Sequence, residues 1–112
     1  MKRPDDQVRL QHMLEAADKT VRLAKGRQRA DLETDETLVL ALTRLLEIIG
    51  EAANGVSAAL RDANPKIPWK QIIGARHHFI HGYFDVDHDI IWQILQTDLP
   101  PLITDLKKLI KQ

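Results

Sequence analysis

The chain has 112 residues, no cysteine, and 16 basic and 16 acidic side chains, which give a formal net charge of zero at neutral pH. A chain of this length is expected to form one domain, residues 1–112, and the lack of cysteine excludes disulfides and thiolate metal sites. The charge balance argues against a broad surface that coats nucleic acid, which would show a basic excess, but it leaves room for a local anion site.

The first residues carry charges without the apolar segment of a secretory signal behind them. The longest apolar stretch, residues 38–50, is interrupted by Arg44 and Glu47 and is too short to span a bilayer. We therefore expect a soluble, cytoplasmic protein that does not enter a membrane.

Two helices are predicted in the first half of the chain. The first begins near Pro4, whose ring suits a first helical position, and stops near Gly26. The second follows Thr34 as its N-cap and carries leucines and isoleucines that recur every three or four residues. It is expected to continue through Gly55 to about Leu60, and the charged run before it is interpreted as a solvated loop.

A connector with two prolines, residues 64–68, separates the second helix from the third. Each proline biases its predecessor away from helical backbone. The third helix is predicted from Pro68 to Gly82, because a glycine there suits the left-handed position that ends many helices.

The fourth helix is predicted to start near Asp87 or His88. It must be kinked or broken at Pro100-Pro101, because neither proline can donate a backbone hydrogen bond. Together these elements predict an all-α fold, an antiparallel four-helix bundle whose last helix is kinked or broken.

Residues 76–83 concentrate polar chemistry, with three of the five histidines, the single tyrosine and one arginine. Arginine presents a planar fork of donors to a phosphate, histidine can move a proton near neutral pH, and the hydroxyl of Tyr83 can donate or accept. This set suits metal-free cleavage of RNA. The ribose 2′-hydroxyl would attack the adjacent phosphate while histidine shuttles a proton and arginine stabilises the developing negative charge.

The spacing of Arg76 and His81 makes a site on one straight helix awkward. Residues five apart point about 140° away from each other around a helix. Two geometries would allow a joint site. The helix could unwind at Gly82 and swing His81 round, or two copies of the helix could cross in a symmetric dimer and pool their side chains.

Two other interpretations of this cluster stay open. His77 and His81 have the i, i+4 spacing of metal ligands, and Asp85, Asp87 or His88 could supply a third ligand, but the glutamate of an HExxH pattern is missing. The cluster could also be a polar, histidine-rich helix end with a purely structural role.

A polar line on the second helix consists of Arg44, Glu47 and Glu51. It could be a salt-bridged solvent face, which is the interpretation we favour for Glu47. Alternatively, Glu47 or Glu51 could line the same cleft and orient Arg76 or His81, and for Glu51 the sequence leaves the choice open.

Around these residues the sequence resembles the HepT-like toxin group of the HEPN superfamily. The motif of that superfamily is Rx4HxY, and the polar His77 after the arginine fits it. The resemblance covers most of the chain from the second helix onward and is carried by the motif Arg76-x4-His81-x-Tyr83, by Arg44 to Ala53, by Ile67-Pro-Trp69, and by Tyr83-Phe-Asp-Val-Asp87 with the following Ile-Ile-Trp92.

This resemblance implies a dimeric four-helix bundle that acts as a metal-independent endoribonuclease toxin on RNA and needs no cofactor. Arg76 and His81 would be catalytic, with Tyr83, His77 and Glu51 in supporting positions. The implied partner is a small nucleotidyltransferase antitoxin of the MNT (MntA-like) kind. It would silence the toxin by transferring AMP from ATP to Tyr83, which places bulk and negative charge in a cleft built for a phosphate.

A rival interpretation belongs to another class of protein. The bundle could be a non-catalytic helical module that binds a nucleotidyltransferase partner and uses the cluster only as a docking surface. The neutral isoelectric point, near 7.0, is compatible with this alternative.

Overall fold

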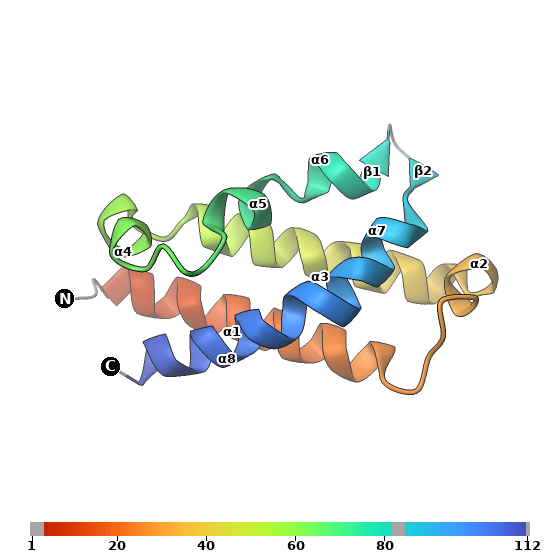
Figure 1. Ribbon diagram of the computed structural model, residues 1–112, viewed down its shortest axis with the longest axis horizontal. Coiled ribbons are helices and arrows are strands. Elements are labelled where there is room, and N and C mark those ends of the chain that lie inside the picture. Colours follow the sequence, from red (N-terminus) through yellow and green to blue (C-terminus); the bar gives the residue numbers. More distant parts are fainter. Residues whose placement is uncertain (1–3, 82–84, 112) are drawn as a thin grey trace.

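The structure is a computed structural model that describes residues 4–81 and 85–111. It is helical over most of its length, with one short hairpin, so the expected all-α class is confirmed at that level (Figure 1). The elements in chain order are α1 (Pro4–Ala24), α2 (Asp31–Thr34), α3 (Glu36–Asn54), α4 (Ala58–Ala63), α5 (Trp69–Gly74), α6 (Arg76–Phe79), β1 (Ile80–His81), β2 (Asp85–Val86), α7 (His88–Gln93), the π-helical η1 (Ile94–Asp98) and α8 (Leu99–Ile110).

Successive segments run back and forth along the long axis of the molecule (Figure 1). Helix α3 returns beside α1, α5 and α6 run outward again, and α7, η1 and α8 return together. The start of α1, the end of α8 and all of α4 therefore lie at one end of the molecule. Helix α2 and the β1–β2 hairpin lie at the other end.

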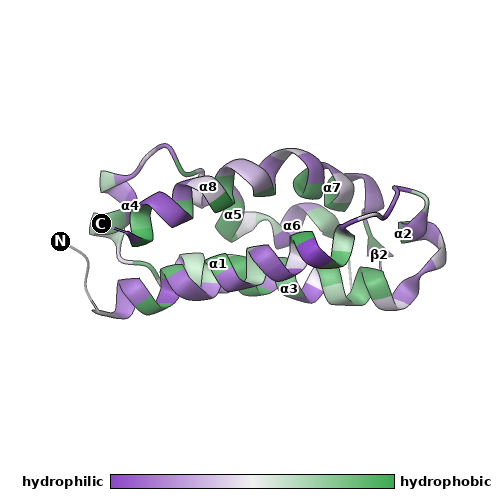
Figure 2. Cartoon of the chain, turned by 90° about the horizontal axis from the view of Figure 1, so that it is seen from below, coloured by the Kyte–Doolittle hydropathy of each residue, from purple (hydrophilic) through white to green (hydrophobic). Residues whose placement is uncertain are grey.

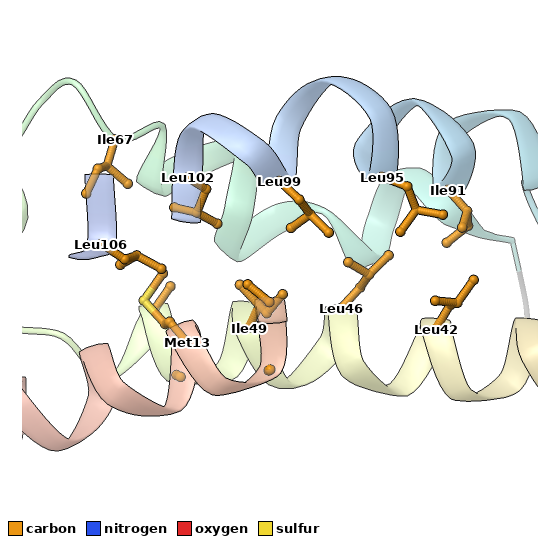
Figure 3. Packing of buried hydrophobic residues seen from close by; sticks show 14 of the residues in the cluster. Met13, Leu42, Leu46, Ile49, Ile67, Ile91, Leu95, Leu99, Leu102 and Leu106 are labelled. Atoms are coloured by element: carbon orange, nitrogen blue, oxygen red, sulfur yellow. The ribbon is translucent and has the colours of Figure 1, made fainter. Parts of the chain in front are cut away.

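The core forms where α1, α3 and the α7–α8 arm face one another. Figure 3 shows Leu95 and Leu99 of this arm facing Leu42 and Leu46 of α3, and Figure 2 shows apolar residues turned inward and polar residues outward. Leu42 is completely buried, as is Met13 of α1. Burying one such side chain contributes about 1.5–3 kcal/mol, so this core is the main source of stability.

The predicted limits of the first helix are confirmed, since α1 spans Pro4–Ala24 and Gly26 follows with a φ of 78°. The predicted N-cap of the next long helix is wrong. Asp35, not Thr34, caps α3, because its side chain accepts the backbone N–H of Leu38 at 3.0 Å. The charged residues before α3 were expected to form a loop, but Asp31–Thr34 among them form the short helix α2.

The expected continuation of this helix to Leu60 is wrong as well. Helix α3 ends at Asn54 and Ser57 starts α4, because its hydroxyl accepts the N–H of Leu60. The carboxylate of Asp6, buried in α1, accepts hydrogen bonds from both the backbone N–H and the hydroxyl of Ser57, each at 2.7 Å. This buried contact fixes the position of the break, together with the local capping of α4 by Ser57.

The prediction of one helix from Pro68 to Gly82 is also wrong. Helix α5 ends at Gly74, α6 ends at Phe79, and Ile80 is extended, with φ −114° and ψ 123°. The backbone N–H of Asp87 donates to the carbonyl of Phe79 at 2.7 Å and thereby closes a hairpin in place of another helical turn. Residues 82–84, with the expected glycine end, lie outside the described part of the chain.

The last arm begins as predicted, because Asp87 caps α7 by accepting the N–H of Ile90 at 3.1 Å. The π-helical segment η1 precedes α8, and both prolines fall in the first turn of α8, where an N–H is least needed. No helix in the described ranges combines the length and the apolar character that crossing a bilayer requires.

Candidate active site

Arg76, the first residue of α6, forms an ion pair with Glu47 of α3. The guanidinium Nε lies 2.8 Å from Glu47 Oε2, and the Arg76 side chain is 58% exposed while that of Glu47 is 20% exposed. A pair this open to water contributes about 1 kcal/mol or less to stability. Its main effect is to fix the direction of the guanidinium, and the exposed guanidinium still presents N–H donors to solvent.

The close approach of α5 to α3 explains why these two residues meet. A Cβ atom built on Gly50 would lie 3.0 Å from the carbonyl oxygen of Ile72, a tighter contact than most Cβ atoms make, so the glycine favours this close approach of the two helices. The helices run in opposite directions (Figure 1). Glu47 lies about one turn before Gly50, and Arg76 lies about one turn after Ile72. Because the two segments are antiparallel, these residues come together.

His81 lies off the helix, in β1, with an exposed side chain. Its Nε2 atom lies 3.3 Å from the backbone carbonyl oxygen of His78, a hydrogen bond that requires a proton on Nε2. The helix therefore unwinds before His81, three residues earlier than the expected position at Gly82. Phe79, which is completely buried, anchors the segment just before this turn.

The hairpin register gives His81 a neighbour that the sequence did not single out for this role. His81 stands opposite Asp85 in the antiparallel pair β1–β2. Residues directly opposite in such a pair have side chains on the same face, with Cβ atoms about 4.5–5.5 Å apart. The Asp85 carboxylate is thus a candidate partner for the imidazole, and sequence reasoning had considered it only as a metal ligand.

The remaining expected site residues take different places. Glu51 accepts a hydrogen bond from Arg44 at 3.1 Å, so Glu47 and not Glu51 is the acid that contacts Arg76. Glu47 is thus salt-bridged, as the favoured interpretation expected, but its partner is Arg76 of the candidate site and not a residue of its own helix. His77 is exposed on α6, and Tyr83 lies outside the described residues.

A network of four charged or titratable side chains ties α2 to the start of α7, next to the hairpin. Arg29 contacts both Asp89, at 2.7 Å, and Glu33, at 2.9 Å, and His88 Nδ1 lies 3.0 Å from Glu33. The hydrogen bond with His88, and then the one with Arg29, hold the pKa of Glu33 below its usual range. The hydrogen bond to Asp89, followed by the one to Glu33, raises the pKa of Arg29.

The metal interpretation has little geometric support in the described ranges. No three histidine, aspartate or glutamate side chains there are grouped so that they could hold a metal ion. The chemistry that the geometry does offer is an oriented guanidinium and an exposed imidazole at the two ends of one short segment. These are the groups needed to bind a phosphate and to transfer a proton.

The fold and the site together describe a helical protein with an arginine and a histidine on one short exposed segment. Comparison with known proteins identifies the family. The family model described as Ribonuclease HepT-like matches residues 13–109. The chain therefore belongs to the HepT-like ribonuclease family.

Individual relatives agree with this assignment. A protein of Caldanaerobacter subterraneus subsp. tengcongensis, named "Putative RNase", is 35% identical over 103 residues, which are 92% of this chain and 92% of that protein. A Methanocaldococcus jannaschii protein of the same name is 31% identical over 91% of this chain and 94% of its own. The "Probable ribonuclease HepT" of Thermococcus cleftensis is 36% identical over 72% of this chain and 74% of its own. No solved structure matched the chain.

Proposed function

We propose that the chain is a metal-independent endoribonuclease that acts in the cytoplasm as the toxin of a toxin–antitoxin pair. The observation that carries the proposal is the Arg76–Glu47 pair, which aims an exposed guanidinium from the same short segment that carries the exposed His81. Membership of the HepT-like ribonuclease family supports RNA as the substrate. We also propose that residues 1–112 form one HEPN-like domain, an antiparallel four-helix bundle whose last helix is kinked or broken near its prolines.

In the proposed mechanism Arg76 binds the scissile phosphate through the N–H groups that face solvent. The 2′-oxygen forms a bond to phosphorus, the bond to the 5′-oxygen breaks, and the products are a 2′,3′-cyclic phosphate and a 5′-hydroxyl. His81 shuttles the proton that leaves the 2′-hydroxyl to the departing 5′-oxygen, and Arg76 stabilises the charge that develops on the phosphate oxygens. Glu47 holds the guanidinium in place without contacting RNA.

Two copies of the chain are proposed to form a homodimer that brings two such segments into one cleft. The resemblance to the dimeric HepT-like toxins motivates this part of the proposal, since one copy could supply the arginine and the other the histidine. Mixing an Arg76→Ala chain with an His81→Ala chain tests it. Recovered cleavage together with a dimeric mass in light scattering would support a shared site, and a monomeric mass would contradict it.

The partner in this proposal is a nucleotidyltransferase antitoxin that transfers AMP to Tyr83. The added phosphate would repel the RNA phosphate and its nucleoside would fill the cleft. Co-expression with the nucleotidyltransferase encoded beside the chain, followed by intact mass measurement, tests this step. A mass increase by whole AMP units that disappears in Tyr83→Phe is expected, and an increase that persists in that variant would rule out Tyr83 as the target.

The activity itself is tested with purified protein and a defined RNA in the presence of EDTA. We expect internal cleavage that leaves cyclic phosphate ends and is abolished when the scissile nucleotide is 2′-deoxy. Loss of cleavage in EDTA with rescue by zinc or manganese would contradict metal independence. Absence of both toxicity and cleavage in the folded protein would favour the rival function, a non-catalytic module that binds a nucleotidyltransferase.

A further inference from the structure

A cavity of about 660 Å³ opens between the α5–α6 segment and the α7–η1–α8 arm. Leu46 of α3 lines its inner end, where this side chain faces Leu99 across the core (Figure 3). Ile72 and Ala75 line one wall and Ile94 lines the opposite one. The volume falls within the roughly 300–1,000 Å³ typical of small-molecule sites, and the walls are apolar as in such sites.

Polar groups gather among these apolar walls. The lining includes the amides of Gln71 and Gln93, the imidazole of His78 and the carboxyl of Asp98. Asp98 is exposed as a whole residue, and partial burial of its carboxyl raises the pKa of that group. A mostly apolar cavity with a few amide and carboxyl groups suits a heteroaromatic ring that has donors and acceptors on its edge.

The π-helical segment η1 contributes directly to the cavity. Three of its residues, Ile94, Thr97 and Asp98, are among those that line it. Single π-helical turns are rare and occur mostly at functional sites, because the widened turn redirects side chains that an α-helix would place elsewhere. Gln96 belongs to the same turn but is exposed and does not line the cavity.

His78 connects the cavity with the candidate active site. Its side chain lines the cavity, while its backbone carbonyl oxygen lies 3.3 Å from Nε2 of His81. A substrate whose phosphate lies at His81 would therefore have a neighbouring group within reach of the cavity. In RNA that neighbouring group is a nucleobase, which a single strand can turn out of its stack.

We propose that this cavity binds the nucleobase next to the scissile phosphate and thereby gives the ribonuclease its sequence preference. The proposal rests on the proposed function for the identity of the substrate. The apolar walls would enclose the ring, and Asp98 and Gln93 would bond to its edge. A carboxylate accepts hydrogen bonds from exocyclic amino groups, so adenine, cytosine or guanine is expected to bind in preference to uracil.

Direct binding tests the proposal without any need for cleavage. AMP, CMP, GMP and UMP are titrated into the ¹⁵N-labelled full chain, and amide shifts are followed by NMR. Shifts at Ala75, Thr97 and Asp98 are expected with an amino-bearing nucleotide, with binding of UMP weaker by about tenfold. Shifts that map elsewhere, or equal binding of all four nucleotides, would overturn it.

Matched variants sharpen the experiment. Gln93→Leu, at the end of α7, is expected to weaken binding about tenfold, whereas Gln96→Leu, on the π-helical turn that follows, is expected to leave binding unchanged. Ala75→Phe should fill the cavity and abolish binding, and Gln93→Leu carries the test if that variant does not fold. Equal binding by Gln93→Leu and Gln96→Leu would contradict the assignment.

Cleavage profiles separate this proposal from the proposed function. With a randomised RNA, Gln93→Leu should change the base preference at one position beside the cut, whereas Gln96→Leu should keep the wild-type preference and the wild-type rate. If wild-type protein binds nucleotides at the cavity but cleaves no RNA, the ribonuclease function fails while the base site stands. If it cleaves RNA with a preference that Gln93→Leu leaves unchanged, the base site fails.

Discussion

The long helices and the short segment from α5 to α7 differ in how they are held. Helices α1, α3 and α8 are stabilised by one cluster of buried apolar residues, part of which is shown in Figure 3. Along the short segment, by contrast, Arg76, His77 and His81 are all exposed, and buried Phe79 anchors them. The residues that stabilise the fold are therefore largely separate from those that could perform chemistry. Changes in the core should mainly lower stability, and changes in the exposed segment should mainly lower activity.

The largest expected effect on stability lies in the core. Leu42→Ala removes a completely buried side chain and should lower the free energy of unfolding by about 2–5 kcal/mol, as measured by urea denaturation. Leu40→Ala on the same helix is the control, because Leu40 is 62% exposed, and it should change the value by less than about 0.5 kcal/mol. Equal losses for the two variants would contradict the assignment of the core.

The contact between the two regions at Gly50 should be the next most sensitive. Gly50→Ala places a methyl group against the Ile72 carbonyl and should cost about 1–3 kcal/mol of stability, because α5 must move away from α3. Gly74→Ala is the matched control, since a Cβ at Gly74 meets no atom within 4 Å. If Gly50→Ala and Gly74→Ala unfolded at the same urea concentration, the close approach of α3 and α5 at Gly50 would be contradicted.

A smaller effect is expected from Glu47, and it should appear in activity rather than in stability. Glu47→Gln weakens the charge-assisted bond to Arg76 and should lower the single-turnover rate of RNA cleavage by about 10- to 100-fold, because the guanidinium is less well placed. The free energy of unfolding should change by about 1 kcal/mol or less. Glu51 contacts Arg44 instead of Arg76, so the control variant Glu51→Gln should cleave RNA at nearly the wild-type rate. Equal cleavage rates for Glu47→Gln and Glu51→Gln would exclude a positioning role for Glu47.

The smallest effect concerns pH and the Glu33 network. The pKa of Glu33 is lowered in the folded state, so the folded protein binds fewer protons there than the unfolded chain. The stabilisation is present above the ordinary glutamate value of about 4.5 and is lost as the pH falls through the lowered folded value. Unfolding curves of wild type and Glu33→Gln should therefore differ at pH 6 and converge in acid. The control Glu15→Gln changes an exposed residue of α1, so its difference in free energy of unfolding from wild type should not depend on pH. A difference between wild type and Glu33→Gln that grew in acid would contradict the prediction.

Periodicity and capping chemistry were sufficient to predict much of the fold. The apolar spacing of α1 and α3 follows from the sequence, as does the start of α7 at the capping residue Asp87. These features depend on residues close together in the chain. The break after Gly55 was missed although Ser57 is a good N-cap for α4, because the contact that holds it comes from Asp6, which is 51 residues away from Ser57.

The residues of the candidate site stay a prediction, and the geometry around them differs from the geometry that the sequence led us to expect. The early end of α6 depends on the pairing of Phe79 with Asp87, which the apolar pattern of residues 68–82 does not reveal. The role of Glu47 depends on the register between α3 and α5. A signal for it was present in Gly50, because a glycine in the middle of an apolar helical face marks a close approach, and counting one turn back from it reaches Glu47.

The separation of fold from chemistry is tested most directly by comparing His81→Ala with His77→Ala. Both histidines are exposed and lie in the same segment, so both variants should keep the wild-type free energy of unfolding to within about 0.5 kcal/mol. The single-turnover rate of RNA cleavage should fall by about 10²- to 10⁴-fold in His81→Ala and stay close to wild type in His77→Ala. Undiminished cleavage by a folded His81→Ala protein would contradict the account.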